Sequence, residues 1–177
     1  MLASTPAGDS GATAHPVHEY WVSEKLDGVR ARWDGRRLWT RGGLPVEAPA
    51  WFTAGWPDHP MDGELWMGRG RFEATSSLVR NPQEDGSAWR ALRFLVFDLP
   101  GHGGRFGERV QAMRALAGPD APPWLRPVAQ SRVADRAELD ARLDAVLDVG
   151  GEGLMLHHDR ARYLAGRSPD LLKLKPH

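Results

Sequence analysis

Residues 19–41 read EYWVSEKLDGVRARWDGRRLWTR, and this stretch decides the fold that we expect. Val29, Ala31 and Trp33 alternate with arginines, which is the period-two pattern of a half-buried strand. The pair Asp34-Gly35 predicts a tight hairpin turn, and residues 38–40 predict a returning strand. The stretch therefore predicts strands joined by a tight turn, with Lys25 at a strand end.

Working outward from this hairpin, the pattern predicts a mixture of strands and helices. Strands are expected over residues 61–67, 93–99, 128–133, 153–157 and 171–175. Helices are expected over residues 72–78, 106–117 and 135–149, where leucines repeat every fourth residue in the last. Because the two types do not alternate as regular βαβ units, an α+β fold is favoured over a doubly wound sheet.

Length and composition exclude several classes of protein. A chain of 177 residues can bury one well-cored domain, and 41% hydrophobic residues exclude wholesale disorder. No apolar run is long enough to span a bilayer, so we expect no membrane partner. Without cysteine there is no disulfide, thiolate metal site or cysteine nucleophile. We expect one domain over residues 18–177, after a flexible leader at residues 1–17 that is rich in Gly, Ala and Pro.

The basic residues are distributed unevenly. The formal net charge is zero, which excludes attraction to nucleic acid by bulk charge alone. Five arginines nevertheless fall within residues 30–41, and they form either a basic face or a solvated hairpin. Of 23 basic residues only Lys25, Lys173 and Lys175 are lysine. Because lysine can act as an amine nucleophile and arginine cannot, these three are candidates for chemistry.

Lys25-Leu26-Asp27-Gly28 is a weak motif alone, since the same letters occur on ordinary surface turns. What gives it weight is the ordered series of short motifs that follows it along the chain. That series is Thr40-Arg41-Gly42-Gly43, Asp62-Gly63-Glu64, Phe97-Asp98-Leu99, Gly151-Glu152-Gly153-Leu154-Met155 and Leu172-Lys173-Leu174-Lys175.

This ordered series resembles the covalent nucleotidyltransferases, which include ATP-dependent DNA ligases, RNA ligases and mRNA capping enzymes. Three further segments are similar to the minimal bacterial ATP-dependent DNA ligases, many of which are exported to the periplasm: residues 20–24, residues 48–55 and residues 163–167. The resemblance implies an adenylation domain of antiparallel sheets flanked by helices, of the ATP-grasp-like ligase type. The OB-fold domain that follows it in such ligases is absent from this chain, so self-adenylation is expected to be impaired.

The resemblance also implies a role for each motif residue. Lys25 would attack the α-phosphate of ATP and carry AMP, while Lys173 and Lys175 would clamp that phosphate. The nucleotide would be bound by Glu24, Arg30, Glu64, Phe97 and Glu152, with the ring of Phe97 on the adenine. Glu64 and Glu152 would also hold Mg²⁺. Arg41 and Arg167 would contact the DNA.

The expected partner is nicked double-stranded DNA, bound by a monomer in a bacterial periplasm, or in the cytoplasm if the resemblance to exported ligases does not hold. Two alternatives stay open at this point. An RNA ligase or capping-type enzyme would use the same lysyl-nucleotide chemistry, and a non-catalytic module would bind nicks without sealing them.

Two other groups of residues are expected to have no functional role. We expect Trp51, Trp56 and Trp66 to pack within the protein rather than to stack on bases. We expect His157 and His158 to share no metal ion, because neighbouring residues of a strand point to opposite faces.

Overall fold

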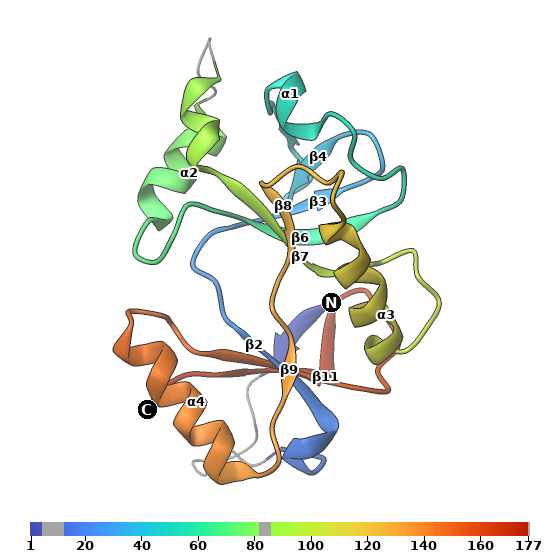
Figure 1. The fold of residues 1–177 in the computed structure, drawn as a ribbon, viewed down its shortest axis with the longest axis vertical. Coiled ribbons are helices and arrows are strands. Elements are labelled where there is room, and N and C mark those ends of the chain that lie inside the picture. The colour runs from blue at the N-terminus through green and yellow to red at the C-terminus, as the bar shows by residue number, and fades with distance from the viewer. Residues whose placement is uncertain (5–12, 82–85, 177) are drawn as a thin grey trace. The chain divides into compact units, whose positions relative to one another are not determined.

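The fold was analysed in a computed structural model that describes residues 1–4, 13–81 and 86–176. The chain forms two compact units. The first unit comprises residues 1–25, 103–110 and 129–177, and the second comprises residues 26–102 and 111–128. Each unit is built on one β-sheet (Figure 1). None of the described helices is both long and apolar enough to cross a bilayer.

The sheet of the second unit has six strands in the order β5-β4-β3-β6-β7-β8. Neighbouring strands are antiparallel except for the edge pair β7 and β8. The hairpin predicted around Asp34-Gly35 is confirmed as β3 and β4, and Asp34 Oδ1 accepts the backbone N–H groups of Arg36 and Arg37 in its turn. The strands are β3 (Val29–Trp33), β4 (Leu38–Thr40), β5 (Pro45–Val46), β6 (Met61–Trp66), β7 (Arg93–Asp98) and β8 (Leu125–Pro127).

Aromatic rings fill the core of this unit. Trp56 packs against Trp33, Phe52 and Phe94, with centroids 5.0–5.3 Å apart, and it is buried. The packing role expected for Trp56 is therefore confirmed. Two helices belong to the unit: α1 (Ala50–Thr53) contributes Phe52, and α2 (Phe72–Arg80) packs on β3 and β6.

The sheet of the first unit has five strands in the order β1-β11-β10-β2-β9. Its pairs are antiparallel except for β1 and β11. The strands are β1 (Leu2–Ser4), β2 (Tyr20–Glu24), β9 (Ser131–Arg132), β10 (Leu154–His158) and β11 (Arg167–Leu174). A third helix, α3 (Phe106–Arg114), begins in this unit.

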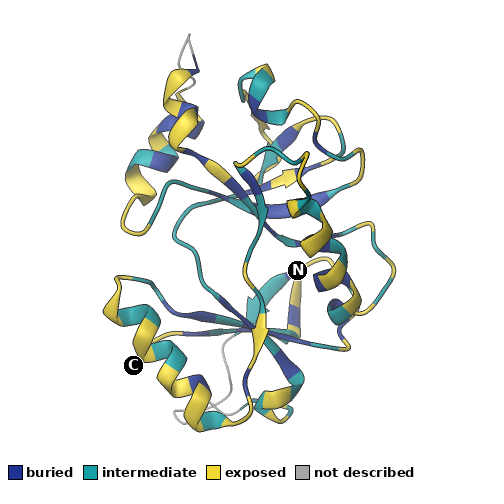
Figure 2. Ribbon diagram, in the orientation of Figure 1, coloured by how far each residue is buried: buried dark blue, intermediate teal, exposed yellow. Residues whose placement is uncertain are grey.

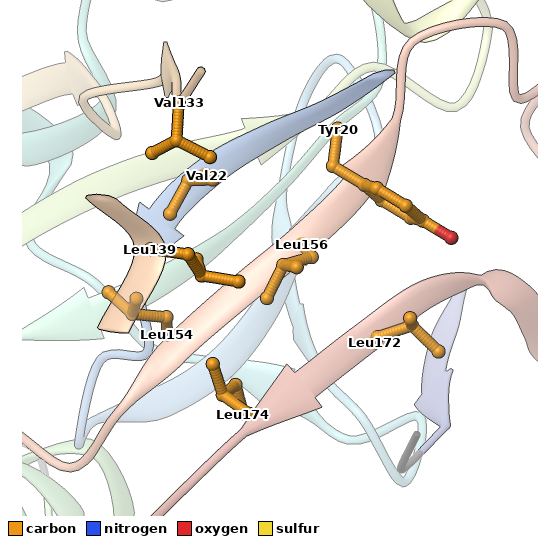
Figure 3. Packing of buried hydrophobic residues seen from close by; sticks show 8 residues of the cluster. All are labelled: Tyr20, Val22, Val133, Leu139, Leu154, Leu156, Leu172 and Leu174. Carbon is orange, nitrogen blue, oxygen red and sulfur yellow. The ribbon is translucent and has the colours of Figure 1, made fainter. Parts of the chain in front are cut away.

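Helix α4 (Arg136–Asp148) covers one face of the five-stranded sheet, where the sequence predicted a helix over residues 135–149. Its N-cap Asp135 accepts the N–H of Glu138, and the Glu138 side chain accepts the N–H of Ala134, the residue before the N-cap. Leu139 is fully buried against leucines and valines of the sheet (Figure 3), whereas the outer side of the helix is exposed (Figure 2). Burying that apolar surface fixes the helix on this face.

The fold differs from the sequence prediction at three places. Residues 2–4 of the expected leader form β1 against β11, with Met1 buried, while residues 5–12 lie outside the described residues. Within residues 128–133, where one strand was expected, only Ser131–Arg132 are in a strand, β9, and β8 ends just before this range at Pro127. The last strand starts at Arg167 rather than at residue 171, because pairing with β1 extends it beyond its partner β10.

Candidate active site

Lys25 lies directly after β2, where its backbone N–H donates to the carbonyl of Gly153 at 2.9 Å. Its Nζ donates to Oε2 of Glu152 at 2.7 Å, and the two side chains are 25% and 38% exposed. A protonated amine has no lone pair for attack, so Lys25 must give up a proton before it can act as a nucleophile. The geometry therefore describes a resting lysine, held in place by a carboxylate.

Two glycines determine the path of the chain around Glu152. A Cβ at Gly151 would lie 2.4 Å from the Val146 side chain and 2.9 Å from Glu24 Oε1. At Gly153, where φ is +150°, a Cβ would lie 2.3 Å from the carbonyl oxygen of Leu174. Only glycine fits such approaches, so these residues bring Glu152 to Lys25.

The register of the strands places the three lysines on one face of the five-stranded sheet. Met155 in β10 lies opposite Ser23 in β2 and Lys173 in β11. Directly opposed residues share a face, and residues two apart along a strand share it too. Lys25 and Lys175 follow Ser23 and Lys173 by two residues, just beyond the strand ends. The opposite face carries the leucines that pack under α4.

In the second unit, a cluster of side chains gathers around Arg30. Its guanidinium lies 5.4 Å from the centroid of the Phe97 ring, and Nη2 is 3.7 Å from Oδ2 of Asp62. Arg30 also lies opposite Glu64 in the pairing of β3 with β6. The cluster thus combines a cation, an aromatic ring and two carboxylates on one face of the six-stranded sheet.

Glycine is required on this face as well. A Cβ at Gly28 would lie 2.2 Å from the carbonyl oxygen of Leu65 and 2.9 Å from the Glu64 side chain. At Gly63 it would lie within 2.7 Å of the Phe94 ring. Close packing around β3, β6 and β7 therefore requires glycine at Gly28 of the Lys-x-Asp-Gly motif and at Gly63 of the Asp-Gly-Glu motif.

The remaining predicted residues lie at separate places. Glu24 is the last residue of β2, on the α4 side, next to Gly151. Arg41 is exposed after β4. Arg167 is exposed and opens β11, before the irregular part of that strand.

Sequence reasoning did not single out Asp62, which is buried and faces Arg30. The available signal was its place two residues before Glu64 in a strand, since alternation puts both on one face. Nor did it foresee the ion pair of Lys25 with Glu152, which depends on residues 127 positions apart.

No protein-family model matches the chain, whereas individual DNA ligases do. A DNA ligase of Haemophilus influenzae is 35% identical over 160 residues, which cover 90% of this chain and 59% of that protein. A solved Lig E DNA ligase is 45% identical, with a TM-score of 0.85, and the match covers 92% of this chain and 64% of that one. By sequence and by fold, the chain is similar to DNA ligases over about nine tenths of its length.

The chain spans about three fifths of the length of these two ligases. A Chlorella virus DNA ligase-adenylate structure is 22% identical, with a TM-score of 0.79 over 98% of this chain and 66% of that one. At that identity the likeness concerns the fold alone. The α+β adenylation-domain fold of the DNA ligases, predicted from the sequence, is thus confirmed.

Proposed function

We propose that this chain is the catalytic domain of an ATP-dependent DNA ligase that carries AMP on Lys25. The observation that carries the proposal is the position of Lys25, which ends β2 beside Glu152 and shares a sheet face with Lys173 and Lys175. The relatives are DNA ligases, which favours this function over an RNA ligase or a capping-type enzyme.

The proposed reaction has three steps. Neutral Lys25 Nζ attacks the α-phosphorus of ATP, so that a P–N bond forms and pyrophosphate leaves. The 5′-phosphate of a nick then attacks the same phosphorus, and the P–N bond breaks as the amine leaves. Finally the 3′-hydroxyl attacks the 5′-phosphate, which seals the strand and releases AMP. Lys173 and Lys175 stabilise the negative charge that develops on the phosphate oxygens, the main contribution in phosphoryl-type transfer.

Binding of the nucleotide is assigned to five residues. The Phe97 ring stacks on the adenine, a role that suits an aromatic side chain already placed against a guanidinium. Arg30, Glu24, Glu64 and Glu152 contact the sugar and phosphates.

Glu64 and Glu152 are also the proposed ligands of Mg²⁺. Carboxylate oxygens are the hard ligands that this ion takes, and the 38% exposure of Glu152 suits an ion that keeps several waters. When bound, Mg²⁺ neutralises phosphate charge. Glu152 would hold the ion together with Glu64, and in the structure its carboxylate positions the Lys25 amine by a hydrogen bond.

The proposed partner is nicked duplex DNA, bound by a monomer. Arg41 and Arg167 are both exposed, and we assign both to contacts with DNA phosphates. The resemblance to exported minimal ligases supports a periplasmic location.

Nick sealing on pre-adenylated substrates tests this function. The chain is given DNA that carries AMP at a nick, beside the matching RNA nick, and sealed product is measured with Mg²⁺. We expect sealing of the DNA nick, its loss in Lys173→Ala, and no change in Arg136→Ala, whose arginine is paired with Asp140. Preference for the RNA nick would favour the rival enzyme. Binding of nicked DNA without sealing would favour the non-catalytic module.

A further inference from the structure

Three side chains that the proposed ligation does not use converge at the other end of the β2–β10 pair from Lys25. His15 and Glu19 precede β2, and His158 ends β10. His158 lies opposite Tyr20, whereas Leu154, four residues earlier, lies opposite Glu24. The rise of a strand puts the cluster about 15–20 Å from Lys25, so it is separate from the candidate active site.

The three side chains present one ligand atom each to a common point. Glu19 Oε2 lies 3.1 Å from Nε2 of His158 and 3.8 Å from Nδ1 of His15. A ligand atom from each residue lies within 4.8 Å of the others. Metal–ligand bonds of about 2.1 Å at tetrahedral angles separate neighbouring ligand atoms by about 3.4 Å. The observed separations of 3.1 Å and 3.8 Å lie on either side of that value, so the ligand atoms need to move only slightly to bind one ion.

Neighbouring side chains contact the proposed ligands through atoms that do not face the shared point, as is common for metal ligands. Oδ1 of Asp170 lies 3.8 Å from Nε2 of His15, on the side of the ring away from Glu19. Arg160 Nη2 lies 3.5 Å from the other carboxylate oxygen of Glu19. The hydrogen bond from His158 lowers the pKa of the Glu19 carboxyl, which therefore carries its negative charge at neutral pH.

The ring of His158 is buried among fixed neighbours. The Tyr20 ring meets it edge-on with centroids 5.3 Å apart, and the backbone N–H of Arg160 donates to its Nδ1 at 3.2 Å. Without a metal ion this donation leaves the proton on Nε2, which donates to Glu19. Metal binding at Nε2 moves that proton to Nδ1 and displaces the Arg160 amide. The losses are two hydrogen bonds of the ring, one from the Arg160 amide and one to Glu19, set against three metal–ligand bonds.

We propose that His15, Glu19 and His158 form a binding site for a transition-metal dication, with Zn²⁺ the favoured ion. Two imidazoles and one carboxylate are a typical Zn²⁺ set, and water completes four-coordination. Mg²⁺ is disfavoured because it requires oxygen ligands. The bound ion would tie the segment before β2 to the ends of β10 and β11, which stabilises the first unit.

Metal binding by the whole chain, stripped with a chelator, tests the proposal. Zn²⁺ is titrated against a chromophoric competitor, and Co²⁺ is used to record the visible bands of a tetrahedral site. We expect one tight site per chain and a rise in the unfolding temperature with Zn²⁺. His15→Ala and Glu19→Gln should weaken Zn²⁺ binding by about 100-fold or more, and Asp170→Asn by about 10-fold.

His18→Ala is the matched control, because His18 is exposed in the same turn as Glu19. It should bind Zn²⁺ as the unchanged chain does. Equal losses in His15→Ala and His18→Ala would show that surface histidines bind the ion adventitiously, and would overturn the proposal. The proposal would also be overturned if the unchanged chain failed to bind Zn²⁺, or if His15→Ala and Glu19→Gln bound Zn²⁺ as tightly as the unchanged chain. His15 and Glu19 are both partly exposed, so these variants are expected to fold, which circular dichroism checks.

Discussion

At the scale of single residues, the side chains of the candidate site are held by neighbours whose roles are mainly positional. Glu152 holds the Lys25 amine in place by a hydrogen bond, and Asp62 faces the Arg30 guanidinium in a partly buried pair. Both contacts are partly exposed, and such pairs contribute little to folding stability. Their role is to orient the Lys25 amine and the Arg30 guanidinium.

His157 gives a residue-scale prediction about pH. It is buried and stacked on Phe106 with centroids 3.6 Å apart, and no described residue gives its Nε2 a hydrogen bond. Burial, and then the nearby Arg109 guanidinium, holds the pKa of His157 well below its ordinary value of 6.5. The folded chain therefore keeps this ring neutral, while the unfolded chain takes up a proton below about pH 6.5. The free energy of unfolding therefore decreases as the pH falls below about 6.5, by up to about 1.4 kcal/mol per pH unit.

The measurement is urea unfolding of the unchanged chain and of His157→Phe between about pH 7 and pH 5. The phenyl ring can keep the stack on Phe106 but cannot titrate, so the variant should lose less stability over this range. An identical pH slope in both proteins would show that His157 is not the source.

At the scale of elements, strands with a local signal were predictable and strands made by distant pairing were not. The alternation at Val29–Trp33 and the Asp34-Gly35 turn specify the β3–β4 hairpin within a few residues, so sequence alone found it. Leu2–Ser4 carries no such pattern, because β1 forms only by pairing with β11 some 160 residues later. The leucine repeat likewise predicted α4.

The turn between Glu152 and β10 gives an element-scale prediction. Gly153→Ala forces both a positive φ and a clash with the Leu174 carbonyl, so it should lower the free energy of unfolding by about 2 kcal/mol or more. Because the clash separates β10 from β11 beside Lys25, AMP transfer should fall as well. Gly150→Ala is the control: its φ is +86° but nothing lies within 4 Å of the added Cβ, so it should cost only about 1 kcal/mol and leave AMP transfer intact. Chemical denaturation and an AMP-transfer assay measure the two effects. Equal destabilisation by both variants would contradict the packing argument.

At the scale of the whole molecule, the order of motifs predicted the site residues and the fold, while their contacts needed the structure. The order made Lys25, Glu64, Phe97 and Glu152 candidates because each stands in a short recognisable motif. It could not supply the approach of Arg30 to Phe97, since a cation–ring contact depends on strand register and on the bulge between β6 and β7. The division into two compact units was also outside its reach, because that division depends on long-range pairing.

Charge distribution gives the whole-molecule prediction. The net charge is zero, so DNA binding must come from local arginines and should weaken steeply with salt. Arg41→Ala should weaken binding to a nicked duplex whatever its sequence, and lower the slope of log affinity against log salt by about 1. Fluorescence anisotropy over a range of salt concentrations measures this. Arg136→Ala serves as the control, and a slope that stays unchanged in Arg41→Ala would remove Arg41 from the DNA contacts.

The central claim is that Lys25 becomes covalently attached to AMP. The most direct measurement is incubation with Mg²⁺ and α-labelled ATP, followed by denaturing electrophoresis and peptide mass mapping of the labelled protein. Labelling is expected to be slow, with AMP found on the Lys25 peptide in an acid-labile phosphoramidate bond and no label in Lys25→Ala. Label on any other residue, or label that persists in Lys25→Ala, would contradict the claim.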